Sequence, residues 1–153
     1  MPFFNADKHI DRCIYSLVNQ GIDFNNYEII LINDGSTDGS KQSAENHLIS
    51  HPNIILHYQE NIGLGASRNE GIELTKGEYI YFIDADDYLT FNVLEVFLKY
   101  LDRFELDLIG FKSLSTSKLD LFQSETKHTI KDYEVISGVE FAEKSDDFLV
   151  MAW

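Results

Sequence analysis

The chain has 153 residues, a length that suits one domain, and a hydrophobic content of 44% that allows a core to form. Its 12 basic and 26 acidic residues give a formal net charge of −14, which disfavours nucleic acid as a partner. No apolar run reaches the roughly 18 residues of a membrane-spanning helix, and the N-terminus has no signal-peptide pattern. The single cysteine, Cys13, excludes an internal disulfide and is expected to be a buried helical thiol, so we predict a cytoplasmic protein.

Helices and strands are expected to alternate along the first half of the chain. Apolar residues at helical spacing predict a helix over residues 6–20, and the isoleucine-rich stretch 27–33 predicts a buried strand. A helix over 39–50 and a strand over 53–59 follow, and the next helix is expected over 66–76.

The second half continues the alternation and then changes composition. Aromatic and β-branched residues predict a strand over 78–84, and Thr90 is expected to cap a helix over 91–104. The remaining expectations are a strand over 107–114, a polar surface excursion over about 115–131 and a short helix within 137–147. This order implies one α/β domain over residues 1–153, with a largely parallel sheet flanked by helices.

The stretch after the strand at 27–33 resembles a calcium-binding loop. Asp34, Ser36 and Asp38 alternate before Gly39, and Glu45 falls where the last ligand would be. A calcium loop needs a preceding helix, however, whereas the residues before Asp34 have strand character. We therefore favour a tight turn, in which one of the polar residues caps the next helix and the glycines permit the change of direction.

A second acidic stretch, "DADD", follows the predicted strand 78–84. Asp84, Asp86 and Asp87 crowd one turn, and their mutual repulsion would destabilise it unless a cation or strong donors compensated. A solvated turn with a helix-capping aspartate is the alternative. We favour a site for Mg²⁺ or Mn²⁺, because this turn and Asp34 both follow strands whose carboxyl ends share one edge of the sheet.

Other enzyme classes fit these motifs less well. Aspartate-nucleophile phosphatases also have a strand followed by D-x-D, but the fifth position of their motif is Thr or Val and is Tyr88 here. The glycines Gly63, Gly65 and Gly71 have the wrong spacing for a dinucleotide fingerprint, and a P-loop is absent. The phosphatase, with Asp84 as nucleophile, stays as an alternative.

Four motifs occur in a fixed order over about residues 2–90. They lie in "PFFNADKHIDRCIYSLVNQ", "YEIILINDGSTDGS" and "ENIGLGASRNEGIELTKGEYIYFIDADDYL", and the chain closes on "AW". This order resembles family 2 glycosyltransferases of the GT-A fold, whose pattern is P-x-Y-N, D-D-G-S-T-D, N-x-G-x-x-x-A-R-N and D-x-D. The resemblance implies a Rossmann-like fold. The family's apolar strand before P-x-Y-N is expected to be missing here, which should leave a gap or exposed edges.

The resemblance also implies a nucleotide-binding role for several residues. Phe4 is expected to stack on the nucleobase, and Asp34 is expected to accept a hydrogen bond from the base, commonly uracil. Arg68 and Asn69 match the A-R-N segment, in which Ser67 replaces alanine, and Arg68 is expected to help place the nucleotide.

The acidic stretch supplies the remaining expected site residues. Asp84 is expected near the ribose or the metal, with Ala85 beside it in the nucleotide site. Asp86 is the expected ligand of a Mn²⁺ or Mg²⁺ cofactor, while Asp87 could cap the turn or assist through water. The frequent aspartate before Asp34 is replaced by Asn33, which leaves the role of Asp34 unaffected.

The function implied by the resemblance is glycosyl transfer. A sugar would pass from a nucleoside-diphosphate sugar, commonly a UDP-sugar, to a saccharide or lipid-linked acceptor, with inversion, in cell-surface polysaccharide synthesis. A divalent ion on Asp86 would stabilise charge on the leaving diphosphate. The general base is expected beyond Trp153, so the chain looks like a nucleotide-binding half, and whether it acts alone is open. A non-catalytic nucleotide-binding remnant is the further alternative. Peripheral association of the full protein with the inner face of the membrane is also open.

Overall fold

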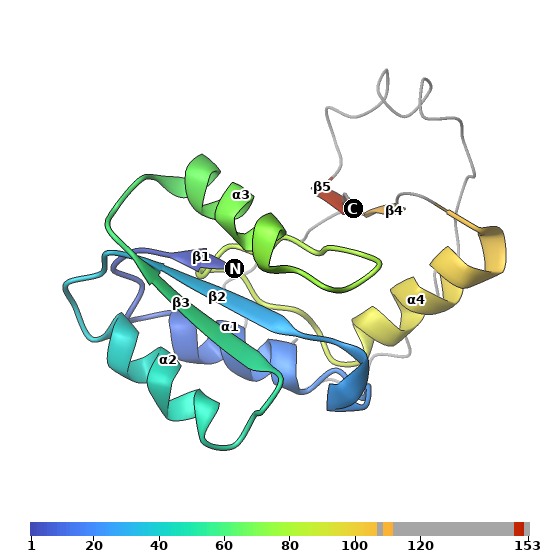
Figure 1. Cartoon of the computed structure of the whole chain (residues 1–153). Coiled ribbons are helices and arrows are strands. Elements are labelled where there is room, and N and C mark those ends of the chain that lie inside the picture. The colour runs from blue at the N-terminus through green and yellow to red at the C-terminus, as the bar shows by residue number, and fades with distance from the viewer. Residues whose placement is uncertain (107–108, 112–148, 152–153) are drawn as a thin grey trace.

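The computed structural model describes residues 1–106, 109–111 and 149–151 (Figure 1). Its elements are, in chain order, β1 (Pro2–Phe3), α1 (Ile10–Val18), the 3-10 helix η1 (Phe24–Asn26), β2 (Ile29–Asp34), α2 (Ser40–Leu48), β3 (Ile54–Gln59), α3 (Leu64–Leu74), α4 (Val93–Phe104), β4 (Ile109–Phe111) and β5 (Leu149–Met151).

A parallel sheet of three strands forms the centre of the described chain. Its order is β1-β2-β3, so β2 has a neighbour on each side. Strand β2 pairs along its whole length with β3, whereas β1 pairs with it only at Pro2 opposite Ile32 and Phe3 opposite Asn33. Helix α3 covers one face of the sheet, and α1 and α2 lie on the other (Figure 1). This arrangement confirms the predicted α/β fold with a mainly parallel sheet between helices.

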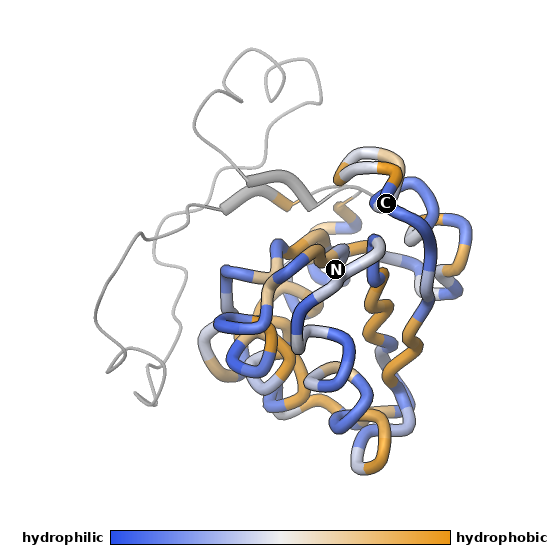
Figure 2. The backbone as a smooth tube through the Cα atoms, turned by 90° about the vertical axis from the view of Figure 1, so that its left-hand side faces the viewer, coloured by the Kyte–Doolittle hydropathy of each residue, from blue (hydrophilic) through white to orange (hydrophobic). Residues whose placement is uncertain are grey.

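The core lies between β2 and helix α1. Every residue of β2 is buried, as the continuous apolar run predicted. Ile10, Ile14 and Leu17 recur at helical spacing on α1 and are buried against the same cluster as Leu31. Figure 2 shows hydrophobic stretches alternating with hydrophilic turns along the described chain.

The predicted helices are confirmed, with shifted ends. Helix α3 begins two residues before the expected start, and α1 spans only the middle of the expected 6–20. Helix α4 lies within the expected 91–104, but the capping role of Thr90 was wrong. The residue before α4 is Asn92, in a left-handed conformation and without a side-chain capping hydrogen bond.

The predicted strand over 78–84 was wrong. This segment is not part of a strand in the described chain. A strand forms only where a neighbour accepts and donates backbone hydrogen bonds, and β1, with two residues, offers too short an edge to pair with a seven-residue segment. Strand β1 lies within the P-x-Y-N motif itself, so it is not the longer apolar strand that the resemblance places before this motif.

A cavity of about 470 Å³ lies beside the central strand. It is lined by residues of β2, by the segment 79–83 and by α4, and the lining includes Ile29, Ile80 and Phe97. The gap or exposed edges expected from a missing strand stay a prediction.

The last described elements form a separate pair. The strand expected over 107–114 is seen as β4, which pairs antiparallel with β5. The predicted excursion over 115–131 and the predicted helix within 137–147 lie outside the described residues. Among the helices that the structure describes, none combines the length and the apolar character needed to cross a bilayer.

Candidate functional site

Hydrogen bonds join the loop after β1 to the turn after β2. The Asn5 amide donates to Ser36 Oγ at 3.1 Å, and the Ala6 amide donates to Ser40 Oγ at 2.7 Å. In the opposite direction, the Thr37 amide donates to Asn5 Oδ1 at 2.9 Å. These bonds hold the loop that begins at Phe4 against the carboxyl end of β2.

Asp38 and glycine shape the turn after β2, although the cap position of α2 is occupied by Gly39 and not by one of the predicted polar residues. Asp38 accepts hydrogen bonds from the amide of Ser40, the first residue of α2, at 3.0 Å and from the Asp7 amide at 3.2 Å. Gly35 has a φ of +76°, which favours glycine. Gly39 has an ordinary φ of −70°, and a Cβ there would meet only the Asp7 carboxylate, which is the end of an exposed side chain.

Asp34 ends β2 as a buried carboxylate with an exposed fraction of 4%. It accepts hydrogen bonds from Gln59 Nε2 at 2.7 Å, from the Ile62 amide at 2.9 Å and from the Gly63 amide at 3.0 Å. Burial alone would raise the pKa of Asp34, but these donors, together with Ser67, outweigh it and keep the pKa below the ordinary value. Asp34 is therefore a charged group that also fixes the loop before α3.

The acidic turn, residues 84–88, follows the segment that was predicted to be a strand and is not one. Arg68 Nη2 of α3 lies 2.6 Å from Asp84 Oδ1, so one of the carboxylates is neutralised by an ion pair. Burial and the nearby charges of Asp86 and Asp84 raise the pKa of Asp87, in agreement with the predicted repulsion. The structure thus places strong negative charge at this turn with one partner cation from α3.

A cleft of about 420 Å³ brings most of the predicted site residues together. Phe4, Asp34, Asp84, Ala85 and Asp86 all line it, although they come from three separate stretches of the sequence. The two residues of the A-R-N segment differ from this group. Arg68 does not line the cleft but is paired with Asp84, which does, and Asn69 is exposed on α3 and does not line the cleft.

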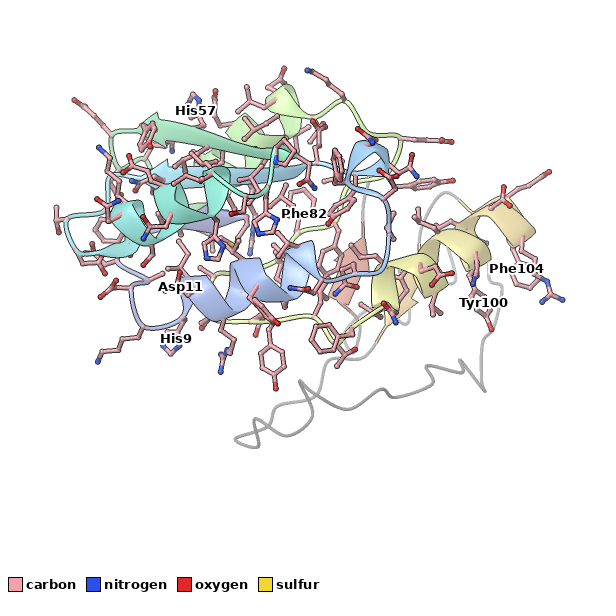
Figure 3. The ribbon with its side chains drawn as sticks, turned by 90° about the horizontal axis from the view of Figure 1, so that it is seen from below. His9, Asp11, His57, Phe82, Tyr100 and Phe104 are labelled. Carbon is pink, nitrogen blue, oxygen red and sulfur yellow. The ribbon has the colours of Figure 1, made fainter. Side chains whose placement is uncertain are left out.

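Several cleft residues were missed by the sequence reasoning. His9 immediately precedes α1, and Figure 3 shows it at the start of that helix. Leu64 opens α3, and Ser67 bonds both Gln59 and the Gly63 carbonyl. The replacement of alanine by Ser67 was visible in the motif, but its contact with Gln59 on β3 could not be predicted from the motif.

Other reactive side chains lie outside the cleft. Cys13 is fully buried on α1, and burial raises its pKa to about 12, so the predicted inert helical thiol is confirmed. His47 pairs with Asp11 at 3.0 Å, and His57 of β3 lies 3.7 Å from Glu70. Figure 3 shows Asp11 at the start of α1 and His57 on β3.

Comparisons with known proteins agree on one family. The family model described as glycosyl transferase family 2 matches residues 1–146. The chain is 42% identical over 94 residues to the cholesterol galactosyltransferase of Borreliella burgdorferi, which covers 61% of the chain and 26% of that protein. It is 30% identical over 140 residues to the poly(ribitol-phosphate) beta-glucosyltransferase of Bacillus spizizenii, which covers 90% of the chain and 22% of that protein.

A solved structure has the same fold. The crystal structure of S. aureus TarS 1-349 in complex with UDP-GlcNAc superposes with a TM-score of 0.72 at 26% identity, over 76% of this chain and 34% of that chain. The chain thus spans about a fifth to a third of the length of these three proteins. With a parallel sheet between helices, an acidic cleft at its edge and a family model that matches nearly all of its residues, the chain belongs to glycosyl transferase family 2 and has the GT-A fold.

Proposed function

We propose that this chain binds the nucleoside diphosphate of a sugar donor, as the donor-binding part of a glycosyltransferase. The donor is a UDP-sugar, and the acceptor is a saccharide or lipid-linked molecule. The observation that carries the proposal is the cleft in which Phe4, Asp34 and Asp86 meet. The likeness to TarS, whose structure holds UDP-GlcNAc, supports the choice of a uridine donor.

Phe4 and Asp34 are suited to hold the base. Phe4 is 50% exposed although it is aromatic, so one face of its ring is available for stacking on a planar ligand. Asp34 Oδ2 accepts one hydrogen bond, from Gly63, and a carboxylate oxygen can accept a second. We assign that remaining position to the ring N–H of uracil.

Asp86 is suited to hold a divalent ion together with the diphosphate. It is exposed at the cleft, and within the described part of the chain its carboxylate accepts no hydrogen bond, whereas Asp84 is paired with Arg68. The described residues contain no group of three His, Cys, Asp or Glu side chains that would hold a metal alone. Mg²⁺ and Mn²⁺ commonly bind through one or two carboxylates plus substrate phosphates, so the residues present fit such an ion.

The bound ion would neutralise charge that develops on the leaving diphosphate. Arg68 orients Asp84 through their ion pair, and we assign it a role in placing the nucleotide. We further propose inversion at the anomeric carbon, a general base beyond Trp153, and a cell-surface polymer as the product. The likeness to the poly(ribitol-phosphate) beta-glucosyltransferase supports the last of these.

Calorimetric titration with UDP in the presence and absence of Mn²⁺ tests the proposal. We expect Mn²⁺ to strengthen UDP binding. In Asp86→Ala, the UDP affinity measured with Mn²⁺ should fall roughly 10-fold or more, because a metal ligand is lost. Glu73→Gln on α3 is the control, because it removes one exposed negative charge away from the cleft lining.

Two outcomes would count against the proposal. Absence of UDP binding in the unmodified chain would refute donor binding, and full Mn²⁺ dependence in Asp86→Ala would refute the role of Asp86. UDP binding by the full protein without sugar transfer would favour the non-catalytic alternative. The family assignment decides against the phosphatase, and Asp84, its required nucleophile, is engaged by Arg68.

A further inference from the structure

We propose that Arg12, Ser16 and Gln20 position the acidic turn, and through it the metal ligand that the proposed function assigns to Asp86. Arg12 and Ser16 are four residues apart on α1 and so lie on one face of the helix, and Gln20 follows four residues later, two residues beyond its last residue, Val18. We call them the α1 polar stripe. Each of them binds the backbone of the segment 86–94, and the inference rests on the proposed function of that segment.

Arg12 holds the turn at the metal ligand itself. Its Nη2 donates to the Asp86 carbonyl oxygen at 2.8 Å, and its guanidinium carbon lies 4.7 Å from the centre of the Tyr88 ring. Because Arg12 binds the backbone of Asp86, the carboxylate is left for the cleft. The guanidinium also places a positive charge beside a turn with three carboxylates.

Ser16 and Gln20 continue the contact along the chain. Both are fully buried. Ser16 Oγ accepts from the Leu89 amide at 3.0 Å, Gln20 Nε2 donates to the Thr90 carbonyl at 2.9 Å, and Gln20 Oε1 accepts from the Leu94 amide at 3.1 Å. Buried polar groups are costly unless they are bonded, so these pairs favour a single alignment of the segment on α1.

The turn depends on these contacts because regular structure does not hold it. The residues from 78 to 92 belong to no helix or strand in the described chain. Their place is therefore set by side chains from elsewhere, and the α1 polar stripe supplies consecutive contacts from Asp86 to Leu94. A metal ligand has to be held to within a fraction of an ångström, so loss of such support should weaken metal-dependent binding.

Three variants test the positioning role: Arg12→Ala, Arg12→Lys and the control Lys8→Ala. Lys8 is an exposed cation just before α1 and does not line the cleft. UDP affinity is measured with Mn²⁺ and with EDTA. We expect Arg12→Ala to weaken the Mn²⁺-dependent affinity by about 10-fold and the affinity in EDTA by no more than about 2-fold. Arg12→Lys should recover part of the loss, because an ammonium can still donate to the Asp86 carbonyl.

An equal loss with Mn²⁺ and with EDTA would overturn the inference, since it would indicate a general structural role. An unchanged Mn²⁺ gain in Arg12→Ala would overturn it as well. Hydrogen exchange separates this inference from the proposed function, because it needs no ligand. Arg12→Ala should speed exchange several-fold in residues 84–94 and leave β2 and β3 unchanged. If the unmodified chain fails to bind UDP, the proposed function fails, and unchanged exchange at 84–94 would then reject the positioning role independently.

Discussion

At the scale of single residues, Asp34 shows how a buried carboxylate is kept charged. Three hydrogen-bond donors, from Gln59, Ile62 and Gly63, converge on it, and two of them are backbone amides. Two structural tasks follow from this arrangement. The charge is available at the floor of the cleft, and the loop between β3 and α3 is tied to the end of β2.

Asp34→Asn is expected to destabilise the fold. Asparagine keeps one acceptor oxygen, but its NH2 group would face the donor or donors of the other oxygen and leave them unpaired, at a cost of about 2 kcal/mol or more. Urea unfolding of the variant beside Glu73→Gln measures the loss. A variant as stable as the control would show that these hydrogen bonds contribute little.

The same carboxylate predicts an acid limit of stability. The pKa of Asp34 is lower in the folded chain than its ordinary value of 3.8, so its contribution is fully present above that value and is lost as the pH falls through the folded pKa. The difference in unfolding free energy between wild type and Asp34→Asn should therefore shrink as the pH falls below 3.8. A pH-independent difference would contradict this assignment.

At the scale of elements, the turn between β2 and α2 depends on one glycine. Gly35 has a φ of +76°, and a Cβ added there would lie 2.9 Å from the Asn61 amide nitrogen. A side chain at position 35 would therefore be destabilised both by backbone strain in the left-handed region and by this close approach. The turn sets the direction of α2 and the position of Asp34, so glycine is required at position 35 to maintain the local structure.

Gly35→Ala should lower the unfolding free energy by about 1–3 kcal/mol. Gly65→Ala is the matched control, because Gly65 lies in α3 with nothing within 4 Å of the added Cβ, and alanine favours helix there. Chemical denaturation of both variants should give shifts of opposite sign. Equal shifts would mean that the left-handed conformation of Gly35 carries no measurable strain.

Element prediction succeeded where the signal was local and failed where it was not. The run ending at Asp34 predicted β2 because a strand buried on both faces is apolar throughout. The segment 78–84 has equally good strand composition, but pairing depends on a neighbour elsewhere in the chain. The contact of Arg12 with Asp86 joins residues 74 apart, and no periodicity in the sequence indicates it.

At the scale of the whole molecule, the net charge of −14 opposes compaction. The exposed ion pairs that offset it, such as Lys99 with Glu95 at 2.7 Å, contribute little in water. Added salt screens the overall repulsion and also weakens these ion pairs. The first effect should be larger, so salt should stabilise the fold.

The melting temperature should rise by a few degrees as NaCl is raised from about 10 mM to about 150 mM, which shortens the screening length from roughly 30 Å to roughly 8 Å. Choline chloride at the same ionic strength should act equally, because the effect is screening and not ion binding. A melting temperature that falls with salt would show that attractive pairs dominate.

The sequence predicted those residues of the candidate site that belong to a motif. Phe4, Asp34 and Asp86 were singled out by motif, and the structure brings them to one cleft. Their roles toward a nucleotide remain predictions. His9 was not found, because it sits in no motif and reaches the cleft only through the fold of the loop before α1.

The long separation between α1 and the acidic turn has a consequence for the order of folding. Strands β2 and β3 pair residues 25 apart, such as Ile29 and Ile54, with α2 connecting them. The bond from Arg12 to Asp86 closes a loop of 74 residues and depends on α1 being formed. Loop closure costs more entropy as the loop lengthens. At the contact between Arg12 and Asp86, no strand pairing offsets this cost. The sheet should consequently assemble before the acidic turn docks, so a newly made chain would form its paired strands first and its cleft last.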